Sequence, residues 1–298
     1  MTTILLTGKT GQVGWELQRA LEPLGRVVAL GRDEMDHTSP DSIRSAIRRV
    51  KPGIVVNAAG YTTVDKAEAE ADLVMRLNAV APGIIAEEAK RADAPLIHYS
   101  TDYVYDGKQD RPYTEDDAPN PLNVYGKSKL AGDRAIQAVG GAHLILRTSW
   151  IYSARGNNFV LTILRLAREK PELSVINDQM GSPSWARSLA QATTDLLRDP
   201  ERIRSQPGIY HLSAGGETSR YGFATAIVGI MKESAGPKEK WAEIKPITTA
   251  HYPALPAMRP LNPVTDKSRI RRVFGIQMPA WQSQLRSFLM DFGAAKRS

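Results

Sequence analysis

The chain contains no cysteine, and this absence excludes several kinds of chemistry at once. Without thiols there is no disulfide framework, no cysteine nucleophile and no thiolate metal site, while a reducing environment is permitted. No apolar run approaches the ~18 residues of a membrane-spanning helix. The segment from Met1 to Leu6 runs directly into a strand-like pattern without the features of a secretory signal. We therefore expect a cytoplasmic protein with no membrane partner.

Long tracts of one charge are also missing. Lys and Arg total 39 against 32 Asp and Glu, a net charge of +7, but the two signs are interspersed along the chain. Nucleic-acid-binding proteins usually gather their basic residues, so we expect no nucleic-acid partner. A diffuse positive field still favours a small anionic ligand such as a diphosphate. The 298 residues, 42% hydrophobic and 24% charged, are typical of a globular protein of one or two domains.

Short β-branched runs alternate with helical patterns from residue 3 to about residue 150. Strands are expected at 3–6, 26–30, 54–57, 95–100 and 143–148, and helices at 12–24, 40–50, 66–92 and 124–138. Repeated strand–helix units predict an α/β fold with a Rossmann-like, doubly wound parallel sheet covered on both faces. Such a sheet binds ligands beyond the carboxyl ends of its strands.

The pattern loosens after residue 150, where Pro and Gly clusters interrupt it. Further helices are expected at 157–170, 184–198, 218–234 and 280–292, and strands near 173–177 and 208–213. We assign residues 1–150 to a dinucleotide-binding Rossmann domain and 151–298 mainly to a smaller C-terminal substrate-binding lobe. The boundary is soft, because segments can cross back.

A glycine-rich loop follows the first expected strand directly. Gly8, Gly11 and Gly14 have the spacing G-x-x-G-x-x-G and open a helix that includes Gln12 and Val13. Glycines there permit a tight turn and a close approach of the backbone to a pyrophosphate, which the helix N-terminus also attracts. A plain glycine turn is the alternative, but the position at the first strand–helix junction favours phosphate binding.

Two further segments complete the expected cofactor site. Arg32 ends the second strand, where NAD-preferring enzymes usually carry an acidic residue, so it favours the 2′-phosphate of NADP. Asp36 follows closely, which makes the preference incomplete. After the strand at 54–57 comes a third segment of Ala58, Ala59, Gly60, Tyr61 and Thr62, and its small residues would let the chain pass near the ribose. Tight packing is the alternative explanation for these small residues.

Tyr125 and Lys129 are the most informative pair for chemistry. Residues at i and i+4 share a helix face, so Lys129 can stand beside the Tyr125 phenol and favour its ionised form. The pattern alone is common on helix surfaces. Upstream, an apolar strand ends in Ser100-Thr101-Asp102-Tyr103, and because strand side chains alternate, only one of Ser100 and Thr101 can face the site well.

In this order the glycine loop, the turn at Asn57, the Ser100-Thr101 pair and Tyr125…Lys129 resemble the extended short-chain dehydrogenase/reductases. Within them the chain resembles the dTDP-4-dehydrorhamnose reductase family. The matching runs span most of the chain: GKTGQVGWELQ at 8–18, NAAGYTTVDKAE at 57–68, HYSTDYV at 98–104, NVYGKSKLAG at 123–132, RTSWIY at 147–152, VINDQMG at 175–181 and Arg259-Pro260.

This resemblance implies NADPH-dependent reduction, with NADH also accepted, of the 4-keto group of dTDP-4-dehydro-β-L-rhamnose, in the last step of making an activated sugar for cell-surface polysaccharides. It implies that Tyr125 delivers the proton, that Lys129 holds the phenolate and the nicotinamide ribose, and that Thr101 binds the carbonyl oxygen. The remaining implied contacts are Tyr99 with the cofactor, Asp102 and Trp150 with the sugar or nucleotide, and Asn158, Gln179 and Arg259 with the nucleotide diphosphate.

Tyr103 separates this chain from related dehydratases. Sugar-nucleotide 4,6-dehydratases of the superfamily follow the catalytic Thr with Asp and Glu, which eliminate water. Here Asp102 is followed by Tyr103, which favours simple ketone reduction.

Some family members hold magnesium at a dimer contact with three carboxylates. Glu16 matches the first and Asp291 could supply the third, but Arg187 stands at the middle position. An arginine opposes a cation, so we expect no metal and salt bridges instead. The family's homodimer is placed in doubt with the metal.

Two other functions are compatible with the motifs. The chain could reduce or epimerise another nucleotide sugar, because the catalytic trio does not encode the hexose. It could also be a non-catalytic NADP-binding regulatory subunit, although such a subunit does not need Thr101, Tyr125 and Lys129.

Overall fold

A six-stranded parallel sheet forms the centre of the computed structural model, which describes residues 1–234 and 239–295. Its order is β10-β5-β4-β3-β1-β2. The strands are β1 (Thr3–Thr7), β2 (Arg26–Leu30), β3 (Ile54–Asn57), β4 (Leu96–Thr101), β5 (His143–Thr148) and β10 (Gly208–His211). β3, β4 and β5 are buried along their whole length, as expected for parallel strands covered on both faces. The expected α/β sheet is confirmed.

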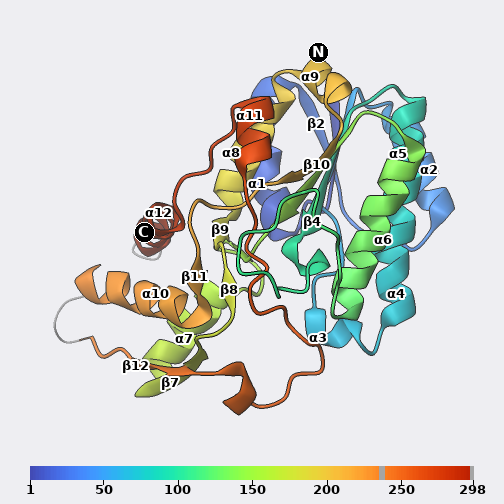
Figure 1. Cartoon of the computed structure of the whole chain (residues 1–298). Coiled ribbons are helices and arrows are strands. Elements are labelled where there is room, and N and C mark those ends of the chain that lie inside the picture. Colours follow the sequence, from blue (N-terminus) through green and yellow to red (C-terminus); the bar gives the residue numbers. More distant parts are fainter. Residues whose placement is uncertain (235–238, 296–298) are drawn as a thin grey trace.

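Helices cover both faces of this sheet (Figure 1). Alternation along β1 sends Leu6 into an apolar cluster with Leu17 and Leu189, and Leu5 into a second cluster with Ile43. The covering helices are α1 (Gln12–Ala20), α8 (Ala186–Leu197), α9 (Pro200–Ser205) and α11 (Ser268–Phe274) on one side, and α2 (Pro40–Val50), α5 (Ala81–Arg91) and α6 (Val124–Val139) on the other.

The single helix expected at 66–92 is wrong, because residues 68–70 interrupt it and a π turn divides the remaining continuous helix into further elements. The elements are α3 (Val64–Ala67), α4 (Ala71–Met75), a π-helical turn η2 (Arg76–Val80), and then α5. Pro82 explains the π turn, since proline has no N–H and its ring crowds the carbonyl four residues earlier. Pro23 likewise converts the end of the helix expected at 12–24 into a 3₁₀ turn, η1 (Glu22–Leu24).

The part after residue 150 contains a second, smaller core. Tyr152, Phe223 and Phe288 pack their rings against one another there, with Tyr152 between the other two. The elements are α7 (Phe159–Glu169), α10 (Arg220–Ser234), α12 (Trp281–Ala295), the parallel pair β7 (Glu172–Ile176) and β12 (Glu243–Ile247), and the short pairs β6 (Ile151–Tyr152) with β9 (Ser184–Trp185) and β8 (Met180–Gly181) with β11 (Thr218–Ser219).

Two elements of this later part return to the large sheet. β10 pairs with β5, and α8 packs closely on α1. The strand expected at 208–213 is therefore the edge of the first sheet. The expected helices at 184–198 and 218–234 each begin two residues late, because β9 and β11 occupy those positions. The assignment of 151–298 to substrate binding stays a prediction.

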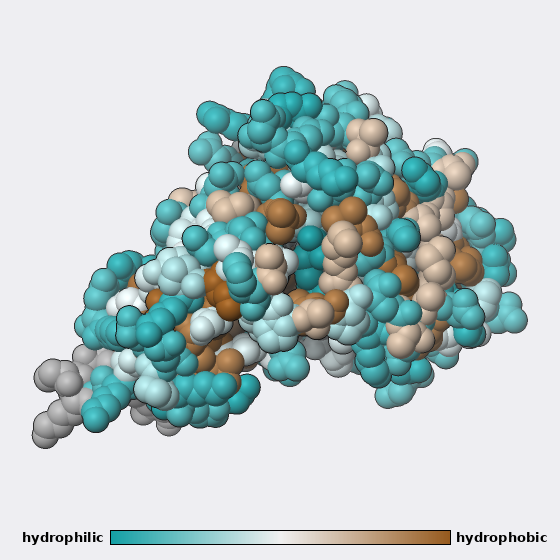
Figure 2. All heavy atoms as spheres, turned by 60° about the horizontal axis from the view of Figure 1, so that its bottom comes forward, coloured by the Kyte–Doolittle hydropathy of each residue, from teal (hydrophilic) through white to brown (hydrophobic). Residues whose placement is uncertain are grey.

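A connecting segment, the strap (residues 252–262), crosses from beyond β12 toward α3 (Figure 1). Arg259 fixes it by two bonds to the Asp65 carboxylate of 2.6 and 2.7 Å, and the Asn123 side chain donates to the Met258 carbonyl at 2.7 Å. The face that Figure 2 brings forward carries apolar side chains around a hollow. Met258 on the strap is exposed, at 66%. In the described ranges no helix is long and apolar enough to cross a membrane.

Candidate active site

The first strand–helix junction forms a cradle that only glycine can line. Gly8 has φ +75°, and a Cβ there would lie 2.7 Å from the Ala59 nitrogen. A Cβ on Gly14 would lie 2.1 Å from the Gly8 carbonyl oxygen. Gly11 begins α1 without a capping hydrogen bond from any side chain that the structure describes. Free backbone N–H groups and the helix dipole therefore meet at this junction and suit an anion.

A cavity of about 250 Å³ opens beside this cradle. Seven predicted cofactor residues line it: Gly8, Gly11, Arg32, Asp36, Ala58, Ala59 and Gly60. Thr10, Leu30, Gly31, Met35, His37 and Leu77 complete the lining. The carboxyl ends of β1, β2 and β3 thus meet at one cavity, which is where a parallel sheet of this kind binds a dinucleotide.

Other predicted cofactor residues occupy different surroundings. The Gln12 side chain accepts hydrogen bonds from Ser153 and Asn158, and Val13 is buried in the core. Tyr61 donates to Glu70 at 2.6 Å, a bond that raises the pKa of Tyr61 to about 12. Thr62 is exposed. Gly14 and these four residues are outside the cavity lining, so their contacts with a cofactor stay predictions.

Tyr99 also points elsewhere. Its side chain lies in the core shared with α8, and its hydroxyl is 2.5 Å from that of Thr193. Only its backbone carbonyl meets the candidate site, where it accepts a bond from Lys129 at 2.6 Å. The structure therefore does not bring the Tyr99 ring to the cavity.

The outer end of the cavity carries charges of both signs. Arg32 is exposed there, while Asp36 accepts two bonds from Thr38 that hold the pKa of Asp36 below its usual value. Lys9 pairs with Glu34 at 2.5 Å, and Glu34 also accepts from the Gly31 amide at 2.7 Å. Lys9 and Glu34 were not anticipated from the sequence.

Thr101 and Tyr125 meet at the carboxyl end of β4. Thr101 is buried and caps the 3₁₀ turn η3 (Asp102–Val104), where its hydroxyl oxygen accepts from the Tyr103 amide. The Tyr103 ring stands edge-on to that of Tyr125, with centroids 5.7 Å apart. Burial raises the pKa of Tyr125, although a hydrogen bond with Thr101 opposes the shift. Ser100 instead lies toward Asp133, because alternation along the strand turns it away from the face of Thr101.

In the structure, Lys129 is bound by groups other than Tyr125. Its Nζ atom is buried, donates to the Tyr99 carbonyl and lies 3.2 Å from Nε2 of His98. Burial lowers the pKa of Lys129 to about 8, and the nearby Asp133 carboxylate opposes this. Lys129 is not among the groups that shift the pKa of Tyr125, which burial raises, so its effect on the ionised phenol stays a prediction.

A second group of side chains faces the same region from the later part of the chain. Trp150 has φ +43°, and its ring fills the space where a Cβ on Gly181 would stand, 2.4 Å away. The Arg220 guanidinium lies 4.3 Å from the Trp150 ring centroid and donates to Gln179 at 3.1 Å. Sequence reasoning missed Arg220, which carries no local signal.

Asp102 lies close to this group and is almost fully buried. Burial raises the pKa of Asp102 to about 6, although hydrogen bonds from Ser149 and Thr101 and the charge of Arg220 oppose the shift. Three predicted substrate residues, Asp102, Trp150 and Gln179, are thus linked through Arg220.

The remaining predicted substrate residues are engaged in structural contacts. Asn158 caps α7 by accepting from the Leu161 amide at 3.1 Å, and it donates to Gln12 beside the glycine cradle. Arg259 is half-buried and paired with Asp65 in the strap. Contacts of Asn158 and Arg259 with a diphosphate stay predictions.

Arg187 forms the salt bridges that the sequence suggested. Its guanidinium lies 2.5 Å from the Asp291 carboxylate and 3.4 Å from that of Glu16, and so joins α8 to α12 and α1. The Arg187 guanidinium therefore already supplies the positive charge between these two carboxylates. The residues present therefore do not fit the family's magnesium ion.

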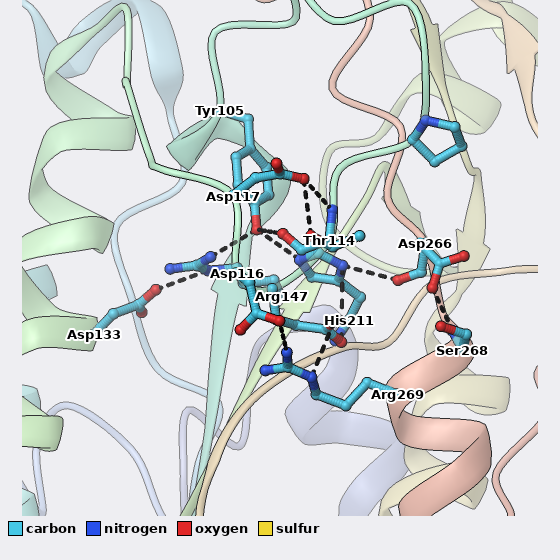
Figure 3. Close-up of polar contacts among 12 residues, drawn as sticks. Tyr105, Thr114, Asp116, Asp117, Asp133, Arg147, His211, Asp266, Ser268 and Arg269 are labelled. Atoms are coloured by element: carbon cyan, nitrogen blue, oxygen red, sulfur yellow. Dashed lines mark hydrogen bonds and ion pairs between the residues drawn. The ribbon is translucent and has the colours of Figure 1, made fainter.

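A series of buried polar side chains joins Asp133, Arg147, Tyr105 and His211 (Figure 3). Arg147 binds Asp133 of α6 at 3.1 Å and donates to the Tyr105 hydroxyl at 2.8 Å. His211 of β10 has Nδ1 2.9 Å from the Asp266 carbonyl, so this nitrogen carries the proton and Nε2 accepts from Tyr105 at 2.8 Å. These hydrogen bonds join β5, α6 and β10 to the loop after β4.

Known proteins of similar sequence match along almost the whole chain. A family model described as the RmlD substrate binding domain matches residues 1–293. The chain is 44% identical over 284 residues to dTDP-4-dehydrorhamnose reductase of Burkholderia thailandensis, covering 94% of this chain and 95% of that protein. It is also 44% identical over 292 residues to the protein of that name from Shigella flexneri, covering 97% of both. The crystal structure of dTDP-4-dehydrorhamnose reductase from Bacillus anthracis in complex with NADP has a TM-score of 0.89 at 31% identity, covering 97% and 99% of the two chains.

Proposed function

The chain belongs to the dTDP-4-dehydrorhamnose reductase family, and we propose that it reduces the 4-keto group of dTDP-4-dehydro-β-L-rhamnose to give dTDP-L-rhamnose, with NADPH as reductant. The observation that carries this proposal is the meeting of Thr101 and a protonated Tyr125 at the end of β4. Thr101 ends β4 and Tyr125 lies on α6, while the neighbouring strands β3 and β1 end at the glycine cradle.

The cradle and cavity fit a dinucleotide, which when bound supplies a hydride to the carbonyl carbon of the substrate. The close approach of Gly8 to Ala59 leaves no room for a side chain, and α1 offers free amides to a pyrophosphate. Arg32 and Lys9 provide positive charge where a 2′-phosphate would lie, which supports NADPH over NADH. Glu34 and Asp36 limit this preference, so we expect some use of NADH.

Negative charge develops on the former carbonyl oxygen during reduction, and this chain supplies a proton and a hydrogen bond to neutralise it. Tyr125 donates its phenolic proton, since its raised pKa keeps it protonated at neutral pH. The Thr101 hydroxyl donates a hydrogen bond to the same oxygen. Lys129 binds the ribose beside them and offers its positive charge once Tyr125 has lost its proton.

The group around Trp150 suits the rest of a nucleotide sugar. An aromatic ring provides a flat apolar surface, and Arg220 beside it provides a fixed positive charge for a diphosphate. Tyr103, which packs against Tyr125, takes the position where a dehydratase would need a carboxylate base. Plain reduction is therefore favoured over elimination.

Product analysis tests the proposed substrate. Purified protein is incubated with NADPH and either dTDP-4-dehydro-β-L-rhamnose or a UDP-4-ketosugar, and the products are identified by NMR. We expect dTDP-L-rhamnose from the first and little turnover of the second. Preferred turnover of the UDP-sugar would assign a different ketoreductase, and NADPH binding without any turnover would point to a regulatory subunit.

We also infer that the reaction takes place in the cytoplasm, because its reductant and its nucleotide-sugar substrate are made there. A homodimer, if formed, would not depend on magnesium, because Arg187 already bridges Glu16 and Asp291 within one chain.

A further inference from the structure

We propose that His98 is a positioning residue for Lys129: its Nε2–H donates a hydrogen bond to Nζ of Lys129 and favours the uncharged amine form of the lysine in the cofactor-free enzyme. His98 lies on β4 and is fully buried between β3 and α6. Its ring has a nitrogen contact on each side, with Asn57 at Nδ1 and Lys129 at Nε2. The direction of both bonds can be read from the groups around them.

The backbone amide of Ala59 and the hydroxyl of Thr7 fix the orientation of the Asn57 side-chain amide. Its Oδ1 atom accepts from the Ala59 backbone amide at 3.2 Å and from the Thr7 hydroxyl at 2.7 Å. A backbone N–H can only donate, so the atom facing Ala59 must be the oxygen. The Nδ2 group of Asn57 is therefore the atom that faces His98, 3.0 Å from Nδ1.

The His98 tautomer follows from this orientation. Because Asn57 donates, Nδ1 must accept and carries no proton. Burial holds the pKa of His98 well below its ordinary value, so the ring is neutral. A neutral imidazole with an unprotonated Nδ1 has its proton on Nε2. That N–H points at Lys129 Nζ, 3.2 Å away.

An ammonium group cannot accept this hydrogen bond, but an amine can. The uncharged Lys129 has a lone pair for His98 and two N–H groups, one of which donates to the Tyr99 carbonyl at 2.6 Å. The titratable groups that act on Lys129 are Asp133 on its own helix and His98 on β4, with His37 beyond His98. Only Asp133 favours the ammonium, and Asp133 is already paired with Arg147.

The consequence for catalysis rests on the proposed function. Lys129 would take up a proton as the negative charge of the dinucleotide enters the cavity, and would become the cation that Tyr125 needs only in the loaded enzyme. The hydrogen-bonded series Thr7, Asn57, His98 and Lys129 links the ends of β1 and β3 and the interior of β4 to α6. It would couple the filling of the cofactor cavity to the charge of the proton-delivery site.

The test uses NMR on the full chain without cofactor, so its outcome is independent of turnover. Lysine labelled with ¹³C at Cε reports the titration of Lys129, assigned with Lys129→Arg. We expect His98→Leu to raise the Lys129 midpoint by about one pH unit, the size of one buried hydrogen bond. His98→Gln, whose amide can donate from the Nε2 position, should keep the midpoint near that of the wild type. An unchanged or lowered midpoint in His98→Leu would overturn the proposal.

A second measurement needs no destabilised variant. Long-range ¹H–¹⁵N correlation of the wild-type histidine rings distinguishes the two tautomers, with the His98 signals assigned by their loss in His98→Gln. The proposal requires a protonated Nε2 and an unprotonated Nδ1 at neutral pH. A protonated Nδ1, or a doubly protonated ring, would contradict it even if the enzyme reduces dTDP-4-dehydrorhamnose as proposed.

Discussion

Tyr125 combines burial with a hydrogen bond to Thr101, and its ionisation is the property most directly open to measurement. Its pKa is raised, so the protonated donor form is present at neutral pH and is lost only as the pH rises through the raised value, above the ordinary ~10. We expect Tyr125→Phe to lower kcat by roughly 10²- to 10⁴-fold. Ultraviolet titration should show no tyrosinate from Tyr125 up to about pH 10. Equal rates in the two proteins would remove Tyr125 from proton transfer.

Arg32 is expected to select the reductant. Replacing it with Ala should raise KM for NADPH about tenfold or more, because a charged contact to a phosphate is lost, and should leave KM for NADH nearly unchanged. Arg26→Ala, at the opposite end of the same strand β2, is the matched control. Steady-state kinetics with both reductants provides the measurement. Parallel losses for NADPH and NADH would mean that Arg32 does not contact the 2′-phosphate.

Arg220 should act on the nucleotide sugar. Arg220→Met keeps a long apolar side chain over Trp150 but removes the charge, so we expect KM for the dTDP-sugar to rise about 10- to 100-fold with a smaller change in kcat. Arg165→Met, which removes an exposed charge from α7, is the control. If the two variants have the same kinetics, the charge of Arg220 contributes nothing to substrate binding.

Site residues could be predicted from the sequence where they belong to a short motif of consecutive residues. Gly8, Thr101 and Tyr125 stand within such motifs, and the cradle and the meeting of Thr101 with Tyr125 are present as expected. Arg220 could not be found in this way, because its position over Trp150 depends on how α10 packs. The partners of Lys129 were also missed, since His98 comes from a strand that reads only as buried.

At the scale of elements, the pair Asp133 and Arg147 fixes α6 against β5. Both side chains are at most 1% exposed. Arg147→Met would leave Asp133 as an unpaired buried charge and should lower the free energy of unfolding by about 3–5 kcal/mol, measured by urea denaturation. The double variant Asp133→Leu/Arg147→Met should recover most of this loss, because no charge is then buried alone. Equal losses in both variants would contradict this account.

Element types were predicted well, and element boundaries less so. Short continuous apolar runs predicted every strand of the large sheet, because burial on both faces leaves a strong pattern. The break at 68–70 and the π turn before Pro82 were missed, since the helical pattern continues through them. The two-residue strands β9 and β11 carry too few residues for any periodic signal.

At the scale of the whole molecule, Arg187 connects α1, α8 and α12 in place of a metal ion. We expect EDTA or millimolar magnesium to change neither the activity nor the sedimentation coefficient of the protein. Arg187→Glu, which restores a carboxylate between Glu16 and Asp291, should make the thermal midpoint depend on magnesium. A magnesium-dependent sedimentation coefficient in the wild type would show that a metal still binds.

The return of β10 to the large sheet has a consequence for synthesis on the ribosome. When residue 150 has emerged, β5 is still an open edge, and the face of α1 that α8 covers is still exposed to water. The glycine cradle near the N-terminus therefore lacks the packing of α8 and the edge strand β10 until about residue 211 has left the exit tunnel. The nascent dinucleotide-binding half should depend on chaperones during this interval, and it should not fold as an independent product if translation stops at residue 150.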